Sequence, residues 1–408
     1  MRRPALGCAL AAALLVGGCG GTASPRPSVV PGRVLNVYTS LPFQGDLASR
    51  ARDTYDAEQL ALAEAGGRSG RFRVHLAPLD NSTFEAGRWD PNQVIANARR
   101  AIQDPHAIAY IGELDTGASA VSIPVLDQKG ILQVSPADGL AGLTHRDGAT
   151  RGEPEKYYPD PRRNFARIVP PDNRQAAAIA AYMKELGVTR LYVANDGGGY
   201  GVAMANALVN DATALGIGVF NNETITPQGA DYAGAARRIV RLVPDAVFFA
   251  GTAHDRAEAL WEQLHSIAPH LKLFGPNALA LPDFYDRIGP AAASTYLVDP
   301  SIPARDRSQT YRSFIDRFRR SYHHTPDRYA VYGYEAMRVV LGALRRAGRH
   351  ANDRRRVIRR VFGQRRADSA VGPYTVDRQG DTTLRSFGAY RVRRGALVFD
   401  RLLTPPGP

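Results

Sequence analysis

Polar residues follow two short apolar runs in the middle of the chain. The runs Ile108–Ile111 and Ile131–Val134 are typical of buried strands. Open parallel sheets bind their ligands beyond the carboxyl ends of their strands, so the residues after each run are the first candidates for a binding site. We therefore expect ligand contacts from Asp115, Thr116, Ala137 and Asp138.

Thr116 stands directly before the segment 117–128, whose apolar residues recur at helical spacing. The first turn of a helix presents unpaired N–H groups and a positive dipole end, and both favour an anion. A threonine in this position also commonly caps the helix that follows it. The sequence leaves two roles open for Thr116, helix cap and ligand contact.

Further candidates lie in the other loops that follow predicted strands. Tyr200 comes near the end of the glycine-rich loop 195–201, and its neighbour Val202 opens the next helix. The glycines are similar to a dinucleotide-binding loop, but Val202 occupies the position of the last glycine in that motif. A tight turn that leaves Tyr200 at the edge of a cleft is the better interpretation. The remaining candidates in such loops are Phe43, Thr252 and Asn277.

Known catalytic and metal-binding patterns do not occur in the sequence. The nine histidines have no metal-ligand spacing, and there is no Gly-x-Ser-x-Gly motif. We therefore expect no enzyme activity and no bound cofactor or metal.

Strands and helices alternate along the chain in two series, the first from Val34 and the second from Asp172. This order predicts two α/β lobes, each with a parallel sheet and right-handed connections. Two long helices, Ser308–Tyr322 and Tyr329–Ala347, are expected to complete the first lobe. The short strands after residue 371 are expected to return to the second. The predicted lobes are residues 34–166 with 300–370, and residues 167–299 with 371–402.

The segment 142–167 shows no helical or strand period. Loops of this length inside a compact domain are uncommon unless they are functional. We expect this segment to lie near the cleft between the lobes.

The amino terminus has the features of a bacterial lipoprotein signal. Arg2 and Arg3 precede the apolar run Leu6–Val16, and small residues then lead to Cys19. The run is short for a membrane span. This resemblance implies removal of residues 1–18 and a lipid on Cys19, with residues 19–33 as a flexible tether of roughly 20 Å. An ordinary secretory signal or a short membrane anchor is the alternative.

Composition excludes some classes of function. The chain has 408 residues, 44% of them hydrophobic, which is enough for a large core. The formal net charge of +13 comes almost wholly from arginine. Its densest cluster, Arg354–Arg360, fits the outer face of an amphipathic helix, and no basic stripe is interleaved with aromatic residues. Nucleic-acid binding is therefore not expected.

Several segments together resemble the type I periplasmic solute-binding proteins of the branched-chain amino-acid (Leu/Ile/Val-binding) family. They are Leu41-Pro-Phe-Gln-Gly45, Ile111-Gly-Glu-Leu-Asp-Thr-Gly117, Gly130-Ile-Leu-Gln-Val-Ser-Pro136, Tyr200-Gly201, Pro244-Asp-Ala-Val-Phe-Phe249 and Val371-Gly-Pro373. The resemblance covers about residues 34–400.

This resemblance implies an α/β, type I periplasmic-binding-protein fold with two Rossmann-like lobes. Three hinge crossovers are expected near residues 167–171, 298–302 and 370–374. A small solute, amino acid-like, would be held between the lobes as they close, and ABC permease subunits would receive it. The protein would be a monomer, extracytoplasmic and lipid-anchored to the bacterial cell membrane. A surface receptor that signals to a partner protein is the alternative role.

The family's binding residues match this chain only in part. The position that holds the ligand's carboxylate matches Thr116, a backbone site matches Ala137 or Asp138, and a tyrosine matches Tyr200. A second tyrosine falls at Thr252 or at the alanine after it. The glutamate that pairs with the ligand's ammonium falls at Asn277, and an amide cannot neutralise a buried charge. Either Asp115 or Asp138 replaces that carboxylate, or the ligand is an amide or a carboxylic acid.

Overall fold

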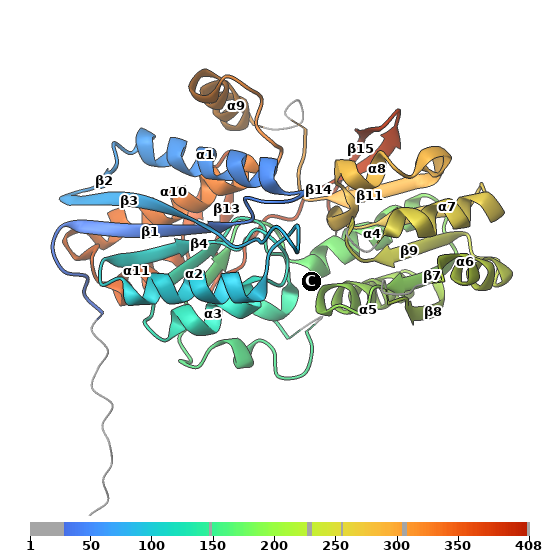
Figure 1. The fold of residues 1–408 in the computed structure, drawn as a ribbon, viewed down its shortest axis with the longest axis horizontal. Helices are drawn as coiled ribbons and strands as arrows, with labels where there is room; N and C mark the ends of the chain where they lie inside the picture. The colour runs from blue at the N-terminus through green and yellow to red at the C-terminus, as the bar shows by residue number, and fades with distance from the viewer. Residues whose placement is uncertain (1–27, 147–148, 227–230, 254–255, 304–307, 406–408) are drawn as a thin grey trace, which may run out of the picture.

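The computed structural model describes residues 28–146, 149–226, 231–253, 256–303 and 308–405. These residues form two α/β lobes that lie side by side along the long axis of the molecule (Figure 1). The predicted two-lobe architecture is therefore confirmed. The predicted signal peptide and Cys19 lie outside the described residues. Within the described part of the chain, no helix is long and apolar enough to cross a membrane.

The first lobe is built on a six-stranded sheet in the order β2-β3-β1-β4-β5-β6. All neighbouring strands are parallel except the β2–β3 pair. Helices cover both faces, so the central strand β4 is buried along its whole length and carries apolar and aromatic residues only. The strands are β1 (Val34–Leu41), β2 (Arg68–Ser69), β3 (Phe72–Asp80), β4 (Ala107–Ile111), β5 (Leu132–Ser135) and β6 (Phe165–Arg167).

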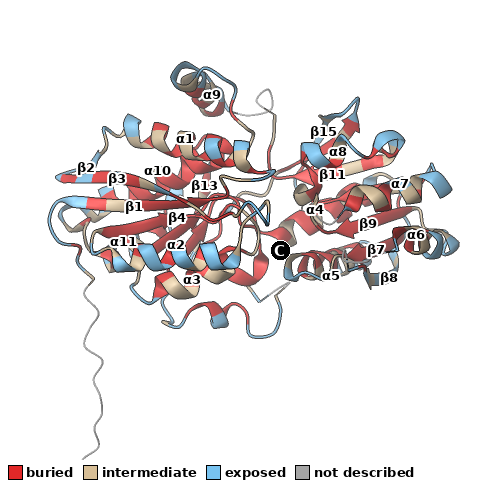
Figure 2. Cartoon of the chain, viewed as in Figure 1, coloured by how far each residue is buried: buried red, intermediate tan, exposed pale blue. Residues whose placement is uncertain are grey.

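The helices of the first lobe divide between the two faces of its sheet. α1, α10 and α11 share the larger apolar core, and α2 and α3 pack on the opposite face. Figure 2 shows the result, with buried strands in the middle and exposed outer faces on the helices. The helices are α1 (Ala48–Glu64), α2 (Pro91–Gln103), α3 (Ser119–Asp127), α9 (Gln309–Tyr322), α10 (Ala330–Ala347) and α11 (Arg354–Val361).

The second lobe has a seven-stranded sheet in the order β15-β14-β11-β10-β9-β7-β8. Its strands are parallel up to β11, and β14 and β15 extend it as an antiparallel hairpin. α4 and α5 cover one face, and α6, α7 and α8 the other. The elements are α4 (Asp172–Glu185), β7 (Arg190–Asn195), α5 (Gly199–Ala214), β8 (Gly218–Thr224), α6 (Tyr232–Arg241), β9 (Ala246–Ala250), α7 (Ala257–Ile267), β10 (Lys272–Gly275), α8 (Pro282–Tyr285), β11 (Thr295–Asp299), β14 (Phe387–Arg393) and β15 (Ala396–Leu403).

The chain crosses between the lobes after β6, after β11 and before β14. The prediction that residues 371–376 return to the second lobe is wrong. β13 (Tyr374–Thr375) pairs with β12 (Arg365–Arg366), and Val371, Tyr374 and Val376 are buried in the first-lobe core. Their apolar side chains are therefore buried within the first lobe. The last crossing between the lobes falls between β13 and β14.

The segment 142–167 is more ordered than its sequence predicts. It contains the 3₁₀ turn η2 (Glu155–Tyr157) and the edge strand β6. Tyr157, Tyr158 and Phe165 share a small apolar cluster with Ile123 of α3 and Ala203 of α5. The aromatic side chains therefore hold this segment against the first lobe and in contact with the second.

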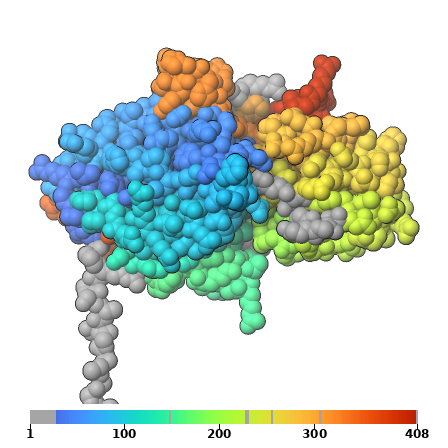
Figure 3. All heavy atoms as spheres, viewed as in Figure 1, coloured from blue at the N-terminus to red at the C-terminus, as the bar shows by residue number. Residues whose placement is uncertain are grey.

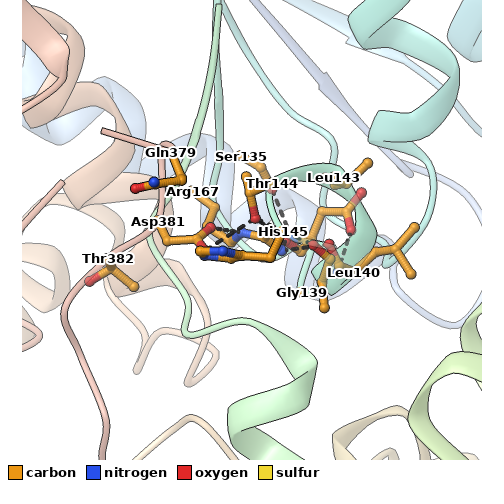
Figure 4. Close-up of polar contacts among 12 residues, drawn as sticks. Ser135, Gly139, Leu140, Leu143, Thr144, His145, Arg167, Gln379, Asp381 and Thr382 are labelled. Atoms are coloured by element: carbon orange, nitrogen blue, oxygen red, sulfur yellow. Dashed lines mark hydrogen bonds and ion pairs between the residues drawn. The ribbon is translucent and has the colours of Figure 1, made fainter. Parts of the chain in front are cut away.

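A buried ion pair joins two of the crossings. Arg167 ends β6, and its Nε lies 2.7 Å from Asp381, which is in the segment between β13 and β14 (Figure 4). Both side chains are fully buried. His145 Nε2 lies 2.5 Å from the other carboxylate oxygen of Asp381, and Thr144 also bonds that oxygen. We call Thr144, His145, Arg167 and Asp381 the crossover clasp.

Candidate functional site

A cavity of about 110 Å³ lies between the two lobes. It is smaller than the ~300–1,000 Å³ pockets that hold drug-sized ligands, so it suits a small solute. Figure 3 shows the blue-to-teal surface of the first lobe against the green-to-yellow surface of the second. The first lobe contributes Leu47, Arg50, Arg88, Trp89, Leu114, Asp115, Thr116, Ala137 and Tyr329, and the second Tyr200, Thr252, Asn277, Ala278 and Leu281.

Most of the predicted site residues lie on the wall of this cavity. They come from loops that follow the carboxyl ends of β4, β5, β7, β9 and β10, as expected for parallel sheets. Phe43 does not line the cavity, and its ring packs edge-on against Tyr55 with 6.1 Å between centroids. The predicted residues that do line it are Asp115, Thr116, Ala137, Tyr200, Thr252 and Asn277.

Asp138 is fully buried and is not among the cavity-lining residues. Its carboxylate accepts hydrogen bonds from the backbone N–H groups of Gly117 at 3.0 Å and Ser119 at 2.8 Å. It therefore occupies the amino end of α3, where the sequence predicts an anionic ligand. A carboxylate is favoured there by the unpaired N–H groups and the helix dipole, and the chain supplies its own.

Of the two roles that the sequence leaves open for Thr116, the structure excludes that of helix cap. α3 begins at Ser119, later than expected, and its N-cap residue, Ala118, makes no capping hydrogen bond through its side chain. The hydroxyl oxygen of Thr116 instead accepts a bond from the N–H of Gly139 at 3.4 Å. This bond uses only the oxygen, so the Thr116 hydroxyl can still donate its proton to a ligand at the cavity wall.

Six residues of the first lobe that sequence reasoning missed also line the cavity, namely Leu47, Arg50, Arg88, Trp89, Leu114 and Tyr329. Arg50, on α1, lies over the ring of Tyr329 at 4.2 Å and pairs with Asp327 at 3.1 Å. Arg88 lies well along the loop after β3. Only residues just beyond strand ends were candidates from the sequence. Sequence reasoning therefore missed Arg50 within a helix, Arg88 deep in a long loop, and Tyr329, which directly precedes α10.

A chain of hydrogen bonds links the two lobes at one end of the cavity. Asn277 Nδ2 donates to the hydroxyl of Tyr329 at 3.2 Å, and that hydroxyl donates to Asp299 at 3.2 Å. Asp299 also pairs with Arg328 at 3.2 Å. These contacts fix the amide of Asn277, with its nitrogen directed to Tyr329 and its oxygen left over.

Three cavity residues carry buried polar atoms that lack a hydrogen-bond partner among the described residues. They are Asp115 Oδ2, the Tyr200 hydroxyl and Asn277 Oδ1. An unsatisfied buried polar atom costs about 1–3 kcal/mol, so native structures seldom leave one without a partner. Three such atoms, from both lobes and on one cavity, indicate a place where a ligand completes the hydrogen bonding.

The acidity of Asp115 follows from its surroundings. Burial and the negative charge of Asp138 together raise its pKa to about 7, although Arg50 and Arg88 oppose the shift. Burial also raises the pKa of Tyr200 well above its usual value, so this residue offers a neutral hydroxyl. At neutral pH a ligand can therefore shift Asp115 toward its charged or its neutral form.

A second buried carboxyl group lies beside Gly139. A Cβ atom on residue 139 would lie 2.1 Å from a carboxylate oxygen of Asp172, so a larger residue would require this side chain to move. Burial, together with the charge of Asp138, raises the pKa of Asp172 to about 7.

Two members of the crossover clasp, His145 and Asp381, form with Asp377 the one group of potential metal ligands found within the described residues. Ligand atoms of His145, Asp377 and Asp381 lie within 4.8 Å of one another. Arg167 already pairs with Asp381, and together with His145 it lowers the pKa of this carboxyl to about 2 despite burial. The charge of Asp381 is thus balanced by the chain itself.

The comparisons with known proteins agree with this geometry. The periplasmic binding protein family matches residues 39–396. A Leu/Ile/Val-binding protein of Rhizobium johnstonii is 26% identical over 361 residues, which are 88% of this chain and 91% of the relative.

Solved structures show the same fold. The leucine-binding protein LivK of Thermotoga maritima matches with a TM-score of 0.77 and 22% identity, over 91% of this chain and 99% of its own. A solute-binding protein of an ABC transporter from R. palustris, in complex with benzoate, matches with a TM-score of 0.71 and 19% identity, over 91% and 97%. The chain therefore belongs to the periplasmic binding protein family, has its type I fold, and is a solute-binding receptor rather than an enzyme.

Proposed function

We propose that the protein captures a small solute with an amino group, an amino acid or a close derivative, in the interlobe cavity and delivers it to an ABC importer. The observation that supports this most directly is the set of unpartnered atoms, Asp115 Oδ2, the Tyr200 hydroxyl and Asn277 Oδ1. A primary ammonium has three N–H donors and no acceptor, so it can satisfy all three atoms at once.

Asp115 supplies the negative charge that Asn277 lacks. Of the two carboxylates available for this role, Asp138 already accepts hydrogen bonds from the N–H groups of Gly117, Ser119 and Leu140. Asp115 keeps one buried oxygen without a partner among the described residues. Thr116 and Arg88 on the same cavity would meet the polar or anionic end of the solute.

A carboxylic acid without an amino group is the second candidate ligand. Two arginines, Arg50 and Arg88, and the ring of Trp89 line the cavity, which suits an aromatic anion. The similar structure from R. palustris contains benzoate. Such a ligand would bind with Asp115 in its neutral form, because two carboxylates at close range cannot both remain charged.

We further propose that the two lobes close on the solute by rotation at the three crossings, as a hinge. A lipid on Cys19 would hold the protein at the outer face of the membrane, close to its permease. The alternative, a receptor that signals to a partner, shares the same cavity. Uptake of the labelled solute in cells lacking this gene separates the two roles, since a purely sensing protein leaves uptake intact.

A thermal-shift screen identifies the ligand class. Amino acids, amides, carboxylic acids, polyamines and sugars would be tested against the protein from Gly20 onward, which contains every residue that the structure describes. A ligand at about a hundred times its dissociation constant adds about 2.7 kcal/mol to stability. Stabilisation by sugars alone would overturn the proposal.

Calorimetry in two buffers of different ionisation enthalpy then tests the role of Asp115. An ammonium favours the ionised carboxylate, so at pH 7 binding should release protons. A carboxylate ligand favours the protonated form, and binding should take protons up. Proton uptake would reject the amino group and support the second candidate ligand. An Asp115→Asn protein is the control, and it should show little proton exchange with either ligand.

A further inference from the structure

A second hollow lies in the first lobe, at the end of its sheet opposite the ligand cavity. It measures about 330 Å³. Its walls come from the stretch before β5, the stretch before β6 and the helix α11. The amino ends of these strands therefore face it, whereas the ligand cavity lies at their carboxyl ends. We call this hollow the basal groove.

The basal groove is rich in cations that have no ion-pair partner among the described residues. They are Lys129, Arg355, Arg359 and Arg378. The two acids of the groove are already engaged, since Asp160 pairs with Arg162 at 2.5 Å and Asp127 is buried and accepts the N–H of Asp160 at 2.7 Å. The groove thus has a net positive charge.

The floor of the basal groove is apolar. Ile358 and Phe362, at and just after the end of α11, are partly buried against the first-lobe core and line the groove. Arginine guanidinium groups bind phosphate oxygens in pairs, and apolar residues between them suit the glycerol and acyl region below a phosphate. The positively charged rim and the apolar floor of the groove together suit an amphiphilic molecule with an anionic headgroup.

The chain enters the fold at this groove. Ser28, the first described residue, lines it, and the Ser28 carbonyl accepts the N–H of Arg354 at 2.8 Å. Cys19 lies nine residues earlier, and nine extended residues span at most about 30 Å. The intervening Gly20–Pro27 segment contains no acidic residue, so it does not complement the cations of the groove.

We propose that the basal groove binds the anionic phospholipid headgroups of the membrane to which Cys19 is anchored. The proposal rests on the lipid anchor of the proposed function, because the short tether keeps the groove within reach of the bilayer. Basic side chains near an anionic membrane surface attract it over about one Debye length, roughly 8 Å at physiological salt. The tether keeps the protein at the membrane, and binding of headgroups in the basal groove orients the protein so that this end of the first lobe faces the lipid.

The test uses the unlipidated protein from Gly20 onward and two kinds of vesicle. Vesicles of phosphatidylcholine with phosphatidylglycerol carry negative charge, and vesicles of phosphatidylcholine alone do not. In co-sedimentation the protein should bind the anionic vesicles and not the neutral ones, and binding should weaken as salt is added. Equal binding to both kinds, or binding to neither, would overturn the proposal.

Matched variants separate the groove from the general positive charge. Lys129→Gln, Arg359→Gln and Arg378→Gln together should weaken vesicle binding by about tenfold or more. Arg237→Gln, Arg241→Gln and Arg320→Gln remove the same charge from exposed sites on α6 and α9, and should change it by about twofold at most. An equal loss of vesicle binding in both sets of variants would show that binding depends only on the protein's net charge, and would contradict a specific role of the groove. Because no lipid anchor is present in this experiment, its failure leaves anchoring at Cys19 untouched.

Discussion

At the scale of single residues, Asp115 is the side chain on which ligand choice depends. Replacing it with asparagine removes the charge but keeps the shape. We expect Asp115→Asn to weaken binding of an amino ligand by about 1.5–3 kcal/mol, as for a lost charged hydrogen bond. Binding of a purely anionic ligand should be unchanged or tighter. Titration calorimetry with the ligand found in the screen measures the difference, and equal affinity for an amino ligand would remove Asp115 from the site.

The same substitution has a pH signature in stability. The pKa of Asp115 rises from 3.8 to about 7 on folding, so the folded state holds its proton more tightly than the unfolded state. Its contribution to the free energy of unfolding therefore falls as pH rises between these values. The stability of Asp115→Asn relative to the natural protein should grow from pH 4 to pH 8 in urea unfolding. A constant difference would contradict the raised pKa.

Thr116 gives the second prediction at this scale. Its hydroxyl can donate to a ligand at the cavity wall, because the bond from Gly139 uses only the hydroxyl oxygen. Thr116→Ala should weaken ligand binding by about 1–3 kcal/mol, the cost of leaving a polar ligand atom without its donor. Thr116→Ser, which keeps the hydroxyl, is the matched control and should bind nearly as well. Unchanged affinity in the alanine variant would exclude a ligand contact.

The candidate site could be predicted from the sequence only where a rule of topology applied. Asp115, Ala137, Thr252 and Asn277 were found because they directly follow strands of parallel sheets. Arg50 was missed because it lies inside α1, and no local pattern distinguishes it from Arg52, the other arginine of that helix. The hydrogen bonds that Asp138 accepts at the amino end of α3 depend on how the loop after β5 packs against the loop after β4. Such packing between loops cannot be predicted from local sequence patterns.

At the scale of elements, the crossover clasp ties the ends of two hinge segments together. Asp381→Asn would leave the buried guanidinium of Arg167 without its counter-charge. Breaking a buried pair from one side typically costs 3–5 kcal/mol, and we expect a loss of about that size in the free energy of unfolding. Chemical denaturation measures it. Asp377→Asn, in a half-buried position of the same segment, is the control and should cost far less.

The clasp also predicts how stability varies with pH. The pKa of Asp381 is lowered to about 2, so its contribution is present above the ordinary value of 3.8 and is lost as pH falls toward 2. The hydrogen bond to Asp381 raises the pKa of His145, so its contribution is present below 6.5 and is lost as pH rises through the folded pKa. In unfolding experiments across this range, His145→Gln should remove the second effect and weaken the first, because Arg167 still pairs with Asp381 in its absence.

Most elements could be predicted from periodicity, and the exceptions have physical reasons. The helix α2 begins with Asp90 as its cap and proline in its first turn, and both are sequence signals for the start of a helix. The two-residue strand β2 is too short to show a period, and β6 lies inside a stretch whose aromatic residues pack without regular spacing. The prediction that residues 371–376 return to the second lobe was wrong, because the sequence of a short apolar strand does not show which of the two cores it packs in.

At the scale of the whole molecule, the lipid anchor remains a prediction from the sequence. Cys19→Ser should release the protein from membranes into the soluble fraction, because no described helix is long and apolar enough to span the bilayer. Fractionation of cells followed by detection of the protein measures this. A Cys8→Ser protein is the control and should stay with the membrane. Continued retention of Cys19→Ser would contradict anchoring at this residue.

The position of Asp138 has a consequence for selectivity. A solute that needs the N–H groups at the start of α3 must displace a carboxylate that belongs to the chain itself. Such an attached group acts at an effective concentration of about millimolar or higher. The Asp138 carboxylate therefore competes permanently with anions from solution for the N–H groups at the start of α3. Simple organic anions find these N–H groups already occupied. Recognition is left to solutes that bind the groups facing the cavity, such as Asp115, Tyr200 and Asn277.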